Sequence, residues 1–245
     1  MMSPDLSLRE AVIHASNVDD DMKFGQVEAK LALAEKYGEI GEKVHGLTNE
    51  ELAAIRFYTQ ETIFYGLLNR SLRSGRAEAY LPYLKLLLRG LIKLPPCQRR
   101  VFRSVGLNLG DKLDGQVGHE VTWWALTSTS VSLQSVVNDP FLKNGNGTIF
   151  SIETDTGVDI APFSEFRGEE ELLLFPGTTL KVKGKVKIQG MPMIQLVEVS
   201  NPGFDIFPRP RDVSVFFSPH TPHTLTFLQQ TALDFSEGFF VVSGV

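Results

Sequence analysis

The chain has 245 residues, of which 42% are hydrophobic, and its mean hydropathy is −0.03. This composition is typical of one globular domain, or of one domain with an extension, and the chain is long enough to bury a core. The formal net charge of −5 and the pI near 5.6 exclude the basic footprint that binding to a nucleic-acid backbone requires, so no nucleic acid partner is expected.

Targeting and membrane signals are missing from the sequence. The first residues lack a positive segment followed by a long apolar run, which a secretory signal would need. No stretch reaches the roughly 18 apolar residues of a membrane-spanning helix. We therefore expect no membrane span and a cytoplasmic or otherwise intracellular location, with delivery into another cell left open. The single cysteine, Cys97, excludes an internal disulfide.

The chain up to about residue 94 follows a helical pattern. Thr48 and Glu51 have the spacing of a capping box, in which each side chain binds a free backbone amide at the start of a helix. Further helices are predicted across residues 76–94. Pro95 and Pro96 end this region, because proline lacks an amide proton and disfavours helix in the residue before it.

Between residues 98 and 199 the pattern changes to short strands separated by turns. In the segment 180–188, Leu180, Val182, Val186 and Ile188 alternate with four lysines, which predicts a half-buried strand whose second face is solvated. The predicted strands are 100–105, 121–126, 148–153, 169–175, 180–188 and 194–199.

The composition also suggests how the chain is divided. Residues 1–46 are predicted to be an N-terminal helical extension, and residues 47–200 a central domain. After Asn201, prolines and phenylalanines become frequent, so we expect residues 201–245 to be a C-terminal extension that packs over the domain or mediates contacts.

Arg103 is the first candidate functional residue. Strand alternation places it on the same face as Val101 and Val105, so that a guanidinium projects from an otherwise apolar side. A charge in this position needs a partner. That partner is either a carboxylate in a structural ion pair or a phosphate or pyrophosphate group, which suits the geometry of arginine.

The second candidate is Ser128, which lies in a run of four hydroxyl residues at 127–130. Such a run after an apolar strand is consistent with a simple turn. It is equally consistent with hydroxyls that bind a ribose or a catalytic carboxylate.

The third candidate is the pair Glu169 and Glu171. If a strand begins at Glu169, both carboxylates face the same side, about 6 to 7 Å apart between Cα atoms. Close carboxylates repel each other, so such a pair indicates a functional site. The alternative is a solvated charge run at the start of a strand.

The order and spacing of these three elements resemble the R-S-E arrangement of the arginine-specific mono-ADP-ribosyltransferases. The resemblance covers roughly residues 47–199 and includes the helical segment 47–59, Arg103, Ser128 and the Glu169-x-Glu171 motif. It implies that residues 47–200 are a catalytic domain and that NAD is the substrate. It also implies an α+β fold, with a helical N-terminal part packed on a small two-sheet β core that encloses an NAD cleft.

Roles for single residues follow from the resemblance. Arg103 is expected to bind the pyrophosphate region of NAD, and Ser128 to order the nicotinamide ribose and the catalytic glutamate. Glu171 is expected to be that catalytic glutamate, while Glu169 addresses the acceptor.

Two further positions are compared with those of similar enzymes. Ser104 stands where similar enzymes usually have a glycine whose backbone contacts the nicotinamide amide. Phe141 falls where they place an aromatic residue near the nicotinamide, although a core phenylalanine explains this position equally well.

The expected function is transfer of ADP-ribose from NAD to an exposed arginine of a protein acceptor. No metal is expected, since His220 and His223 lack a nearby cluster of cysteines or carboxylates. The alternatives are an NAD glycohydrolase on the same scaffold, a catalytically inactive relative that binds proteins, and a structural module that does not bind NAD.

Overall fold

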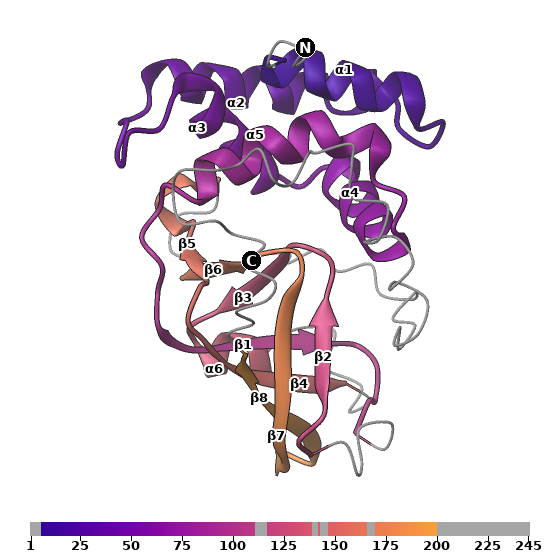
Figure 1. Ribbon diagram of the computed structural model, residues 1–245, viewed down its shortest axis with the longest axis vertical. Helices are drawn as coiled ribbons and strands as arrows, with labels where there is room; N and C mark the ends of the chain where they lie inside the picture. The colour runs from indigo at the N-terminus through magenta and orange to yellow at the C-terminus, as the bar shows by residue number, and fades with distance from the viewer. Residues whose placement is uncertain (1–5, 111–116, 139–141, 143–146, 166–169, 200–245) are drawn as a thin grey trace.

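The computed structural model describes residues 6–110, 117–138, 142, 147–165 and 170–199. The N-terminal helices lie together at one end of the molecule, and the strands form the other end (Figure 1). The helices are α1 (Leu8–Val18), α2 (Glu28–Ile40), α3 (Asn49–Tyr58), α4 (Ile63–Ser74), α5 (Leu81–Leu91) and, within the strand region, α6 (Leu133–Val137). Short 3₁₀ turns occupy Phe24–Gln26, Glu78–Tyr80 and Ala161–Phe163.

The predicted start of a helix after Thr48 is confirmed. The Thr48 hydroxyl accepts a hydrogen bond from the Glu51 amide, and the Glu51 carboxylate accepts one from the Thr48 amide at 2.8 Å. Glu51 is almost fully buried, and its carboxylate also forms an ion pair with Lys93. The helices predicted across residues 76–94 are confirmed as a 3₁₀ turn followed by α5.

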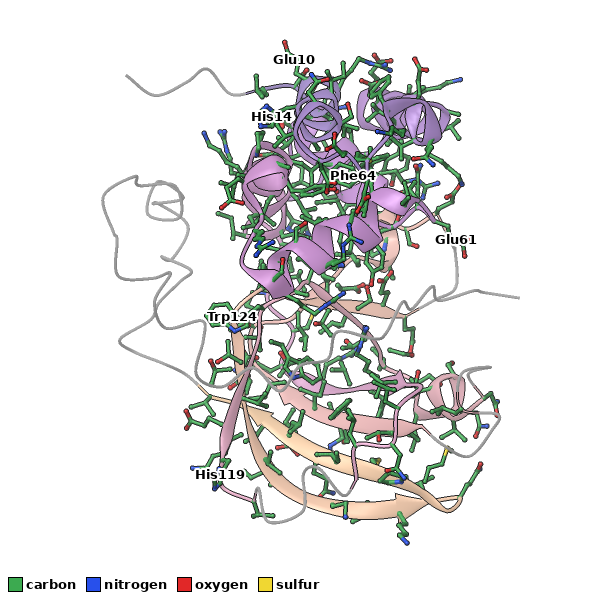
Figure 2. The ribbon with its side chains drawn as sticks, turned by 90° about the vertical axis from the view of Figure 1, so that its right-hand side faces the viewer. Glu10, His14, Glu61, Phe64, His119 and Trp124 are labelled. Carbon is green, nitrogen blue, oxygen red and sulfur yellow. The ribbon has the colours of Figure 1, made fainter. Side chains whose placement is uncertain are left out.

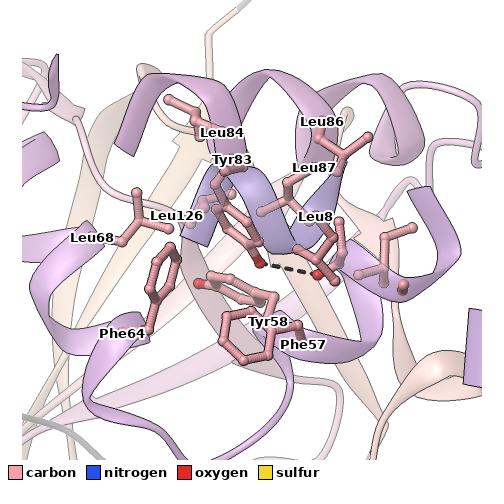
Figure 3. Close-up of a cluster of buried hydrophobic side chains, with 14 of the residues drawn as sticks. Leu8, Phe57, Tyr58, Phe64, Leu68, Tyr83, Leu84, Leu86, Leu87 and Leu126 are labelled. Atoms are coloured by element: carbon pink, nitrogen blue, oxygen red, sulfur yellow. Dashed lines mark hydrogen bonds between the residues drawn. The ribbon is translucent and has the colours of Figure 1, made fainter. Parts of the chain in front are cut away.

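One hydrophobic core joins the helices to each other and to part of the sheet. Tyr83 is fully buried at its centre, where its hydroxyl donates a 3.0 Å hydrogen bond to the carbonyl of Ala54 (Figure 3). The same core includes Leu8 and Leu31 from the first two helices and Leu173 from a strand. The division at residue 46 stays a prediction, but the side chains on both sides of it pack in this shared core.

The strands form a mixed sheet, which confirms the predicted α+β class. They are β1 (Arg99–Val105), β2 (Glu120–Trp123), β3 (Thr127–Ser130), β4 (Thr148–Thr154), β5 (Val158–Asp159), β6 (Glu171–Leu174), β7 (Thr178–Ile188) and β8 (Met191–Glu198). Their order is β2-β7-β8-β4-β1-β3-β6-β5, with β4 and β8 parallel and the other pairs antiparallel.

The sheet has a weak joint between β1 and β3. These two strands are paired only at Phe102 and Ser130, whereas β1 and β4 are paired along seven residues from Arg99 to Val105. The joint divides the sheet into a group of five strands, β2-β7-β8-β4-β1, and a group of three, β3-β6-β5, which lies nearer the helices (Figure 1). Where two sheets were predicted, the structure has one eight-stranded sheet whose strands form two groups.

The predicted alternation along residues 180–188 is interrupted, so Val186 and Ile188 do not share a face with Leu180 and Val182. Val182 is paired with Leu196 but Gly184 with Gln195, so Lys183 is an extra residue in a β-bulge. The bulge reverses the faces of the strand that follows it. Leu180 and Val182 are buried in a core that also contains Leu172 and Leu174 of β6, whereas Val186 is 42% exposed.

Candidate active site

Arg103 lies at the joint between the two groups of strands. It is half-buried on β1, opposite Phe150 of β4. Its guanidinium Nη1 donates a 2.7 Å hydrogen bond to the main-chain carbonyl of Ser128 on β3. Within the described ranges Arg103 takes part in none of the ion pairs, so the structural salt bridge is not formed there. A guanidinium has five N–H donors, and this hydrogen bond orients the group while using one of them.

The run of hydroxyl residues around Ser128 is a strand, so the alternative of a simple turn is wrong. The preceding strand ends at Trp123 rather than at residue 126, and the chain changes direction before β3 begins. Burial explains the change, because Leu126 is 2% exposed and packs with Leu68 in the helical core (Figure 3). Trp124, at the change of direction, lies at the boundary between helices and sheet (Figure 2).

Pairing of β3 with β6 brings Glu171 to this joint. Glu171 lies directly opposite Ser130, and Leu173 lies opposite Ser128. The neighbouring Thr129 hydroxyl donates a 2.7 Å hydrogen bond to the carbonyl of Leu172, which fixes the register. Glu171 is half-buried and is the first residue of β6.

Tyr58, at the end of α3, is close enough to Glu171 to feel its charge, and the sequence did not single it out. Tyr58 is 4% exposed, and its ring meets that of Tyr65 edge to face with centroids 5.2 Å apart. Burial raises the pKa of Tyr58 well above its usual value, and the nearby charges of Tyr65 and Glu171 raise it further. Tyr58 therefore stays neutral, and its hydroxyl accepts a 3.4 Å hydrogen bond from Asn69 Nδ2. No local pattern indicates this proximity, because the two residues are far apart in the sequence.

Arg73, near the end of α4, is a second cation close to Arg103. Its side chain keeps contact with solvent, but partial desolvation lowers its pKa, and the positive charge of Arg103 lowers it further. The positive charge of Arg73 therefore lies within electrostatic range of Arg103. A pyrophosphate is an anion that accepts several hydrogen bonds from guanidinium groups.

The structure thus brings together Arg103, Ser128 and Glu171 from three strands. Ser104 follows on β1, half-buried and opposite Ile149. Glu169 and Phe141 lie outside the described residues, so their predicted places stay predictions. The described part of the chain contains no group of three or more histidine, cysteine or acidic residues that could hold a metal ion, and no helix long and apolar enough to cross a membrane.

Known proteins that are similar to this chain include a protein family and a curated relative. A family model described as NAD:arginine ADP-ribosyltransferase matches residues 14–202. An erythroblast NAD(P)(+)--arginine ADP-ribosyltransferase from Gallus gallus is 33% identical over 165 residues. The match covers 61% of this chain and 51% of the chicken protein, so the chain spans about half the length of that relative.

Two solved structures share the fold. The type III effector XopAI from Xanthomonas axonopodis pv. citri has a TM-score of 0.58 at 17% identity, covering 81% of this chain and 89% of that one. Vis toxin, an ADP-ribosyltransferase from Vibrio splendidus, has a TM-score of 0.51 at 20% identity, covering 73% of this chain and 87% of that one. At these sequence identities, the similarity shows that the folds are alike.

Proposed function

We propose a function from one premise: the chain belongs to the NAD:arginine ADP-ribosyltransferase family. The function is transfer of ADP-ribose from NAD to an arginine side chain of a protein acceptor, with release of nicotinamide. NAD is a substrate in this reaction, because its nicotinamide–ribose bond is broken.

The observation that carries the proposal is the convergence at the joint of the sheet. Arg103 from the five-strand group reaches Ser128 in the three-strand group at 2.7 Å, and Glu171 lies on the strand paired with that of Ser128. Three groups therefore meet where the two groups of strands join. The cation of Arg103 suits the phosphates, and the Ser128 hydroxyl and the Glu171 carboxylate suit the reacting ribose. Arg73 adds a second cation to the phosphate side.

The proposed chemistry begins at the bond between the nicotinamide nitrogen and C1′ of the ribose. When this bond breaks, its electron pair leaves with nicotinamide and positive charge builds on the ribose, as in glycoside hydrolysis. A carboxylate that accepts a hydrogen bond from the ribose 2′-hydroxyl stabilises this charge more strongly as it grows. Glu171 is the proposed carboxylate, and Ser128 is proposed to orient the ribose and Glu171.

The acceptor is a poor nucleophile because its guanidinium is cationic. We assign its orientation to Glu169, whose carboxylate would draw charge from the guanidinium. A guanidinium nitrogen then forms the new bond to C1′ and loses one proton. The products are ADP-ribosylated arginine, nicotinamide and that proton, so atoms and charge balance.

The function can be tested with agmatine, which presents the guanidinium of arginine on a small molecule. We expect the protein to label agmatine from NAD, and Glu171→Gln to lower both labelling and nicotinamide release by roughly 10²- to 10³-fold. Glu169→Gln should abolish labelling while hydrolysis of NAD persists. The control is Glu170→Gln, since Glu170 is exposed between the two. Nicotinamide release that never labels agmatine would instead support the glycohydrolase.

A further inference from the structure

Glu198, the last residue of β8, binds the turn that joins the two groups of strands. This turn, residues 154–157, connects β4 of the five-strand group to β5 of the three-strand group. Its first residue, Thr154, is 2% exposed, whereas Asp155 and Thr156 are exposed. We call residues 154–157 the linking turn.

The carboxylate of Glu198 accepts four hydrogen bonds from the linking turn. Oε2 accepts from the Thr154 hydroxyl at 2.7 Å, the Asp155 amide at 2.7 Å and the Thr156 amide at 3.1 Å. Oε1 accepts from the Thr156 hydroxyl. The Thr154 hydroxyl accepts in turn from the Gly157 amide at 3.1 Å. An ionised carboxylate is only an acceptor, with about four lone-pair sites, so one side chain fixes the whole turn.

The last residue of the linking turn lies directly against β6. A Cβ atom added at Gly157 would come 2.6 Å from Cδ2 of Leu172 and 3.1 Å from Cδ2 of Leu174, so this close approach requires glycine. The Gly157 carbonyl also accepts a 2.7 Å hydrogen bond from the Cys97 amide. Leu172 follows Glu171 in the sequence, so the linking turn contacts the neighbour of the proposed catalytic carboxylate.

The strand after the linking turn holds the backbone of Glu171 itself. β5 is paired with β6, and Asp159 lies opposite Leu172. Directly after β5, the amide of Ile160 donates a 3.1 Å hydrogen bond to the carbonyl of Glu171. A shift of the linking turn is therefore passed to Glu171 both by packing and by hydrogen bonds.

The linking turn matters because the proposed site is divided between the two groups of strands. Arg103 and Glu198 belong to the five-strand group, whereas Glu171 belongs to the three-strand group. At the joint between β1 and β3, only Phe102 and Ser130 are paired, so this pairing alone constrains the two groups weakly. Glu198 supplies a second connection, because it holds the linking turn to the end of β8.

We propose that Glu198 is a positioning residue for catalysis by Glu171. By binding the linking turn, it keeps the proposed catalytic carboxylate at the ribose while Arg103 binds the phosphates of the same NAD molecule. Loss of these bonds should slow cleavage of the nicotinamide–ribose bond, because catalysis depends on close positioning. Affinity for NAD should change little, since Arg103 lies in the other group of strands. This inference rests on the proposed function.

The experiment measures kcat and KM for NAD from nicotinamide release by the full chain. For Glu198→Ala we expect kcat to fall roughly tenfold, below the hundredfold that a 1 Å misplacement can cost. The Kd for NAD, measured calorimetrically in the slow Glu171→Gln background, should stay the same with and without Glu198→Ala. Glu198→Gln should retain most of kcat, because its amide oxygen accepts from the turn amides and its amide nitrogen donates to the Thr156 hydroxyl.

A double-mutant cycle separates positioning from a general loss of structure. If Glu198 acts through Glu171, adding Glu198→Ala to Glu171→Gln should lower nicotinamide release by less than about twofold. A general structural defect would instead lower the rate by the same factor in both backgrounds.

The matched control is Glu153→Ala. Glu153 is an exposed glutamate of β4 that pairs with Arg100 and makes no hydrogen bond to the linking turn in the described part of the chain. It should leave kcat unchanged. Thr156→Val should lower kcat less than Glu198→Ala does, whereas Thr156→Ser should retain it because the hydroxyl remains. This exposed pair of variants tests the proposal even if Glu198→Ala does not fold.

Two results would overturn the inference alone. One is a wild-type kcat for both Glu198→Ala and Thr156→Val, and the other is an equal loss in both backgrounds of the cycle. A wild-type protein that releases no nicotinamide from NAD would overturn the proposed function together with this inference. Release without agmatine labelling would refute transfer only, because the cycle reads nicotinamide and still decides the positioning role.

Discussion

At the residue scale, the proposed role of Arg103 is to bind the pyrophosphate of NAD. Its guanidinium is oriented by the carbonyl of Ser128 at 2.7 Å, and it shares its surroundings with the cation of Arg73. A planar guanidinium can donate to that carbonyl and to a phosphate at the same time, whereas a lysine ammonium at this position lacks the fixed fork.

We therefore expect Arg103→Lys to lower kcat/KM for NAD by roughly 30-fold, which corresponds to about 2 kcal/mol of lost charge-assisted hydrogen bonding. Nicotinamide release measured against NAD concentration checks this. The control is Arg100→Lys, which changes an exposed arginine of the same strand that is paired with Glu153. If Arg103→Lys has the same kcat/KM for NAD as the Arg100→Lys control, the Arg103 guanidinium does not have the proposed role in binding phosphate.

Buried tyrosines predict how stability depends on pH. Burial raises the pKa values of Tyr58 and Tyr83 well above 10.0. Above pH 10 the unfolded chain loses these protons while the folded chain keeps them, so the free energy of unfolding falls as pH rises. Each tyrosine contributes about 1.4 kcal/mol per pH unit there.

Urea denaturation between pH 8 and about pH 11 measures this slope. Tyr83→Phe removes one titrating group and should make the slope shallower, although it also leaves the carbonyl of Ala54 without its hydrogen bond. Equal slopes for the variant and the wild-type protein would show that Tyr83 titrates normally in the folded state.

At the scale of single elements, the N-cap positions of α3 and α4 form a natural comparison. Thr48 caps α3 with its hydroxyl, whereas Thr62, at the N-cap of α4, makes no side-chain cap. Within the described residues the buried hydroxyl of Thr62 has no hydrogen-bond partner.

Thr48→Ala should therefore lower the free energy of unfolding by about 1 kcal/mol. Thr62→Ala should be close to neutral or slightly stabilising, because it removes a buried hydroxyl that lacks a partner. Chemical denaturation of both variants gives the two values. The assignment of the caps is wrong if Thr62→Ala proves the more damaging substitution.

The elements also show what could be predicted from the sequence. Alternation and turn residues indicated most strands, and the capping box indicated the start of α3, because these signals are local. The bulge at Lys183 was not predicted, because the alternation of apolar residues and lysines looks continuous in the sequence. Only the pairing with β8 shows that the strand changes faces at this residue. The order of Arg103, Ser128 and Glu171 was recognisable only through the resemblance to a family.

The contacts that complete the candidate site could not be read from the sequence. Lys30 meets Glu165 across more than a hundred residues, and the charge of Glu171 reaches Tyr58 across a similar separation in the sequence and raises its pKa. Such contacts depend on how the helices pack against the three-strand group. A tyrosine among apolar residues and a lysine on an amphipathic helix are both ordinary features of a sequence, so neither indicates its partner.

At the scale of the whole molecule, the N-terminal helices and the sheet share one core. Leu8, Val12 and Leu31, all from the first 46 residues, are fully buried in it. Removing residues 1–46 would expose the apolar surface of α3 and α5 to water. This exposure costs roughly 25 cal/mol of free energy for each Å² of apolar surface.

We expect a chain that begins at residue 47 to lose cooperative unfolding, because each fully buried leucine alone contributes about 1.5 to 3 kcal/mol. Thermal unfolding followed by circular dichroism compares it with the full chain. A truncated chain that unfolds as sharply and at the same temperature would show that residues 1–46 are a dispensable extension.

We propose above all that this chain transfers ADP-ribose to a guanidinium with Glu171 as the catalytic carboxylate. The most direct test is mass spectrometry of agmatine after incubation with NAD and the full 245-residue chain. We expect ADP-ribosylated agmatine to accumulate together with nicotinamide, and to be lost with Glu171→Gln while Glu170→Gln retains it. Nicotinamide without the agmatine product, or undiminished product from Glu171→Gln, would contradict the claim.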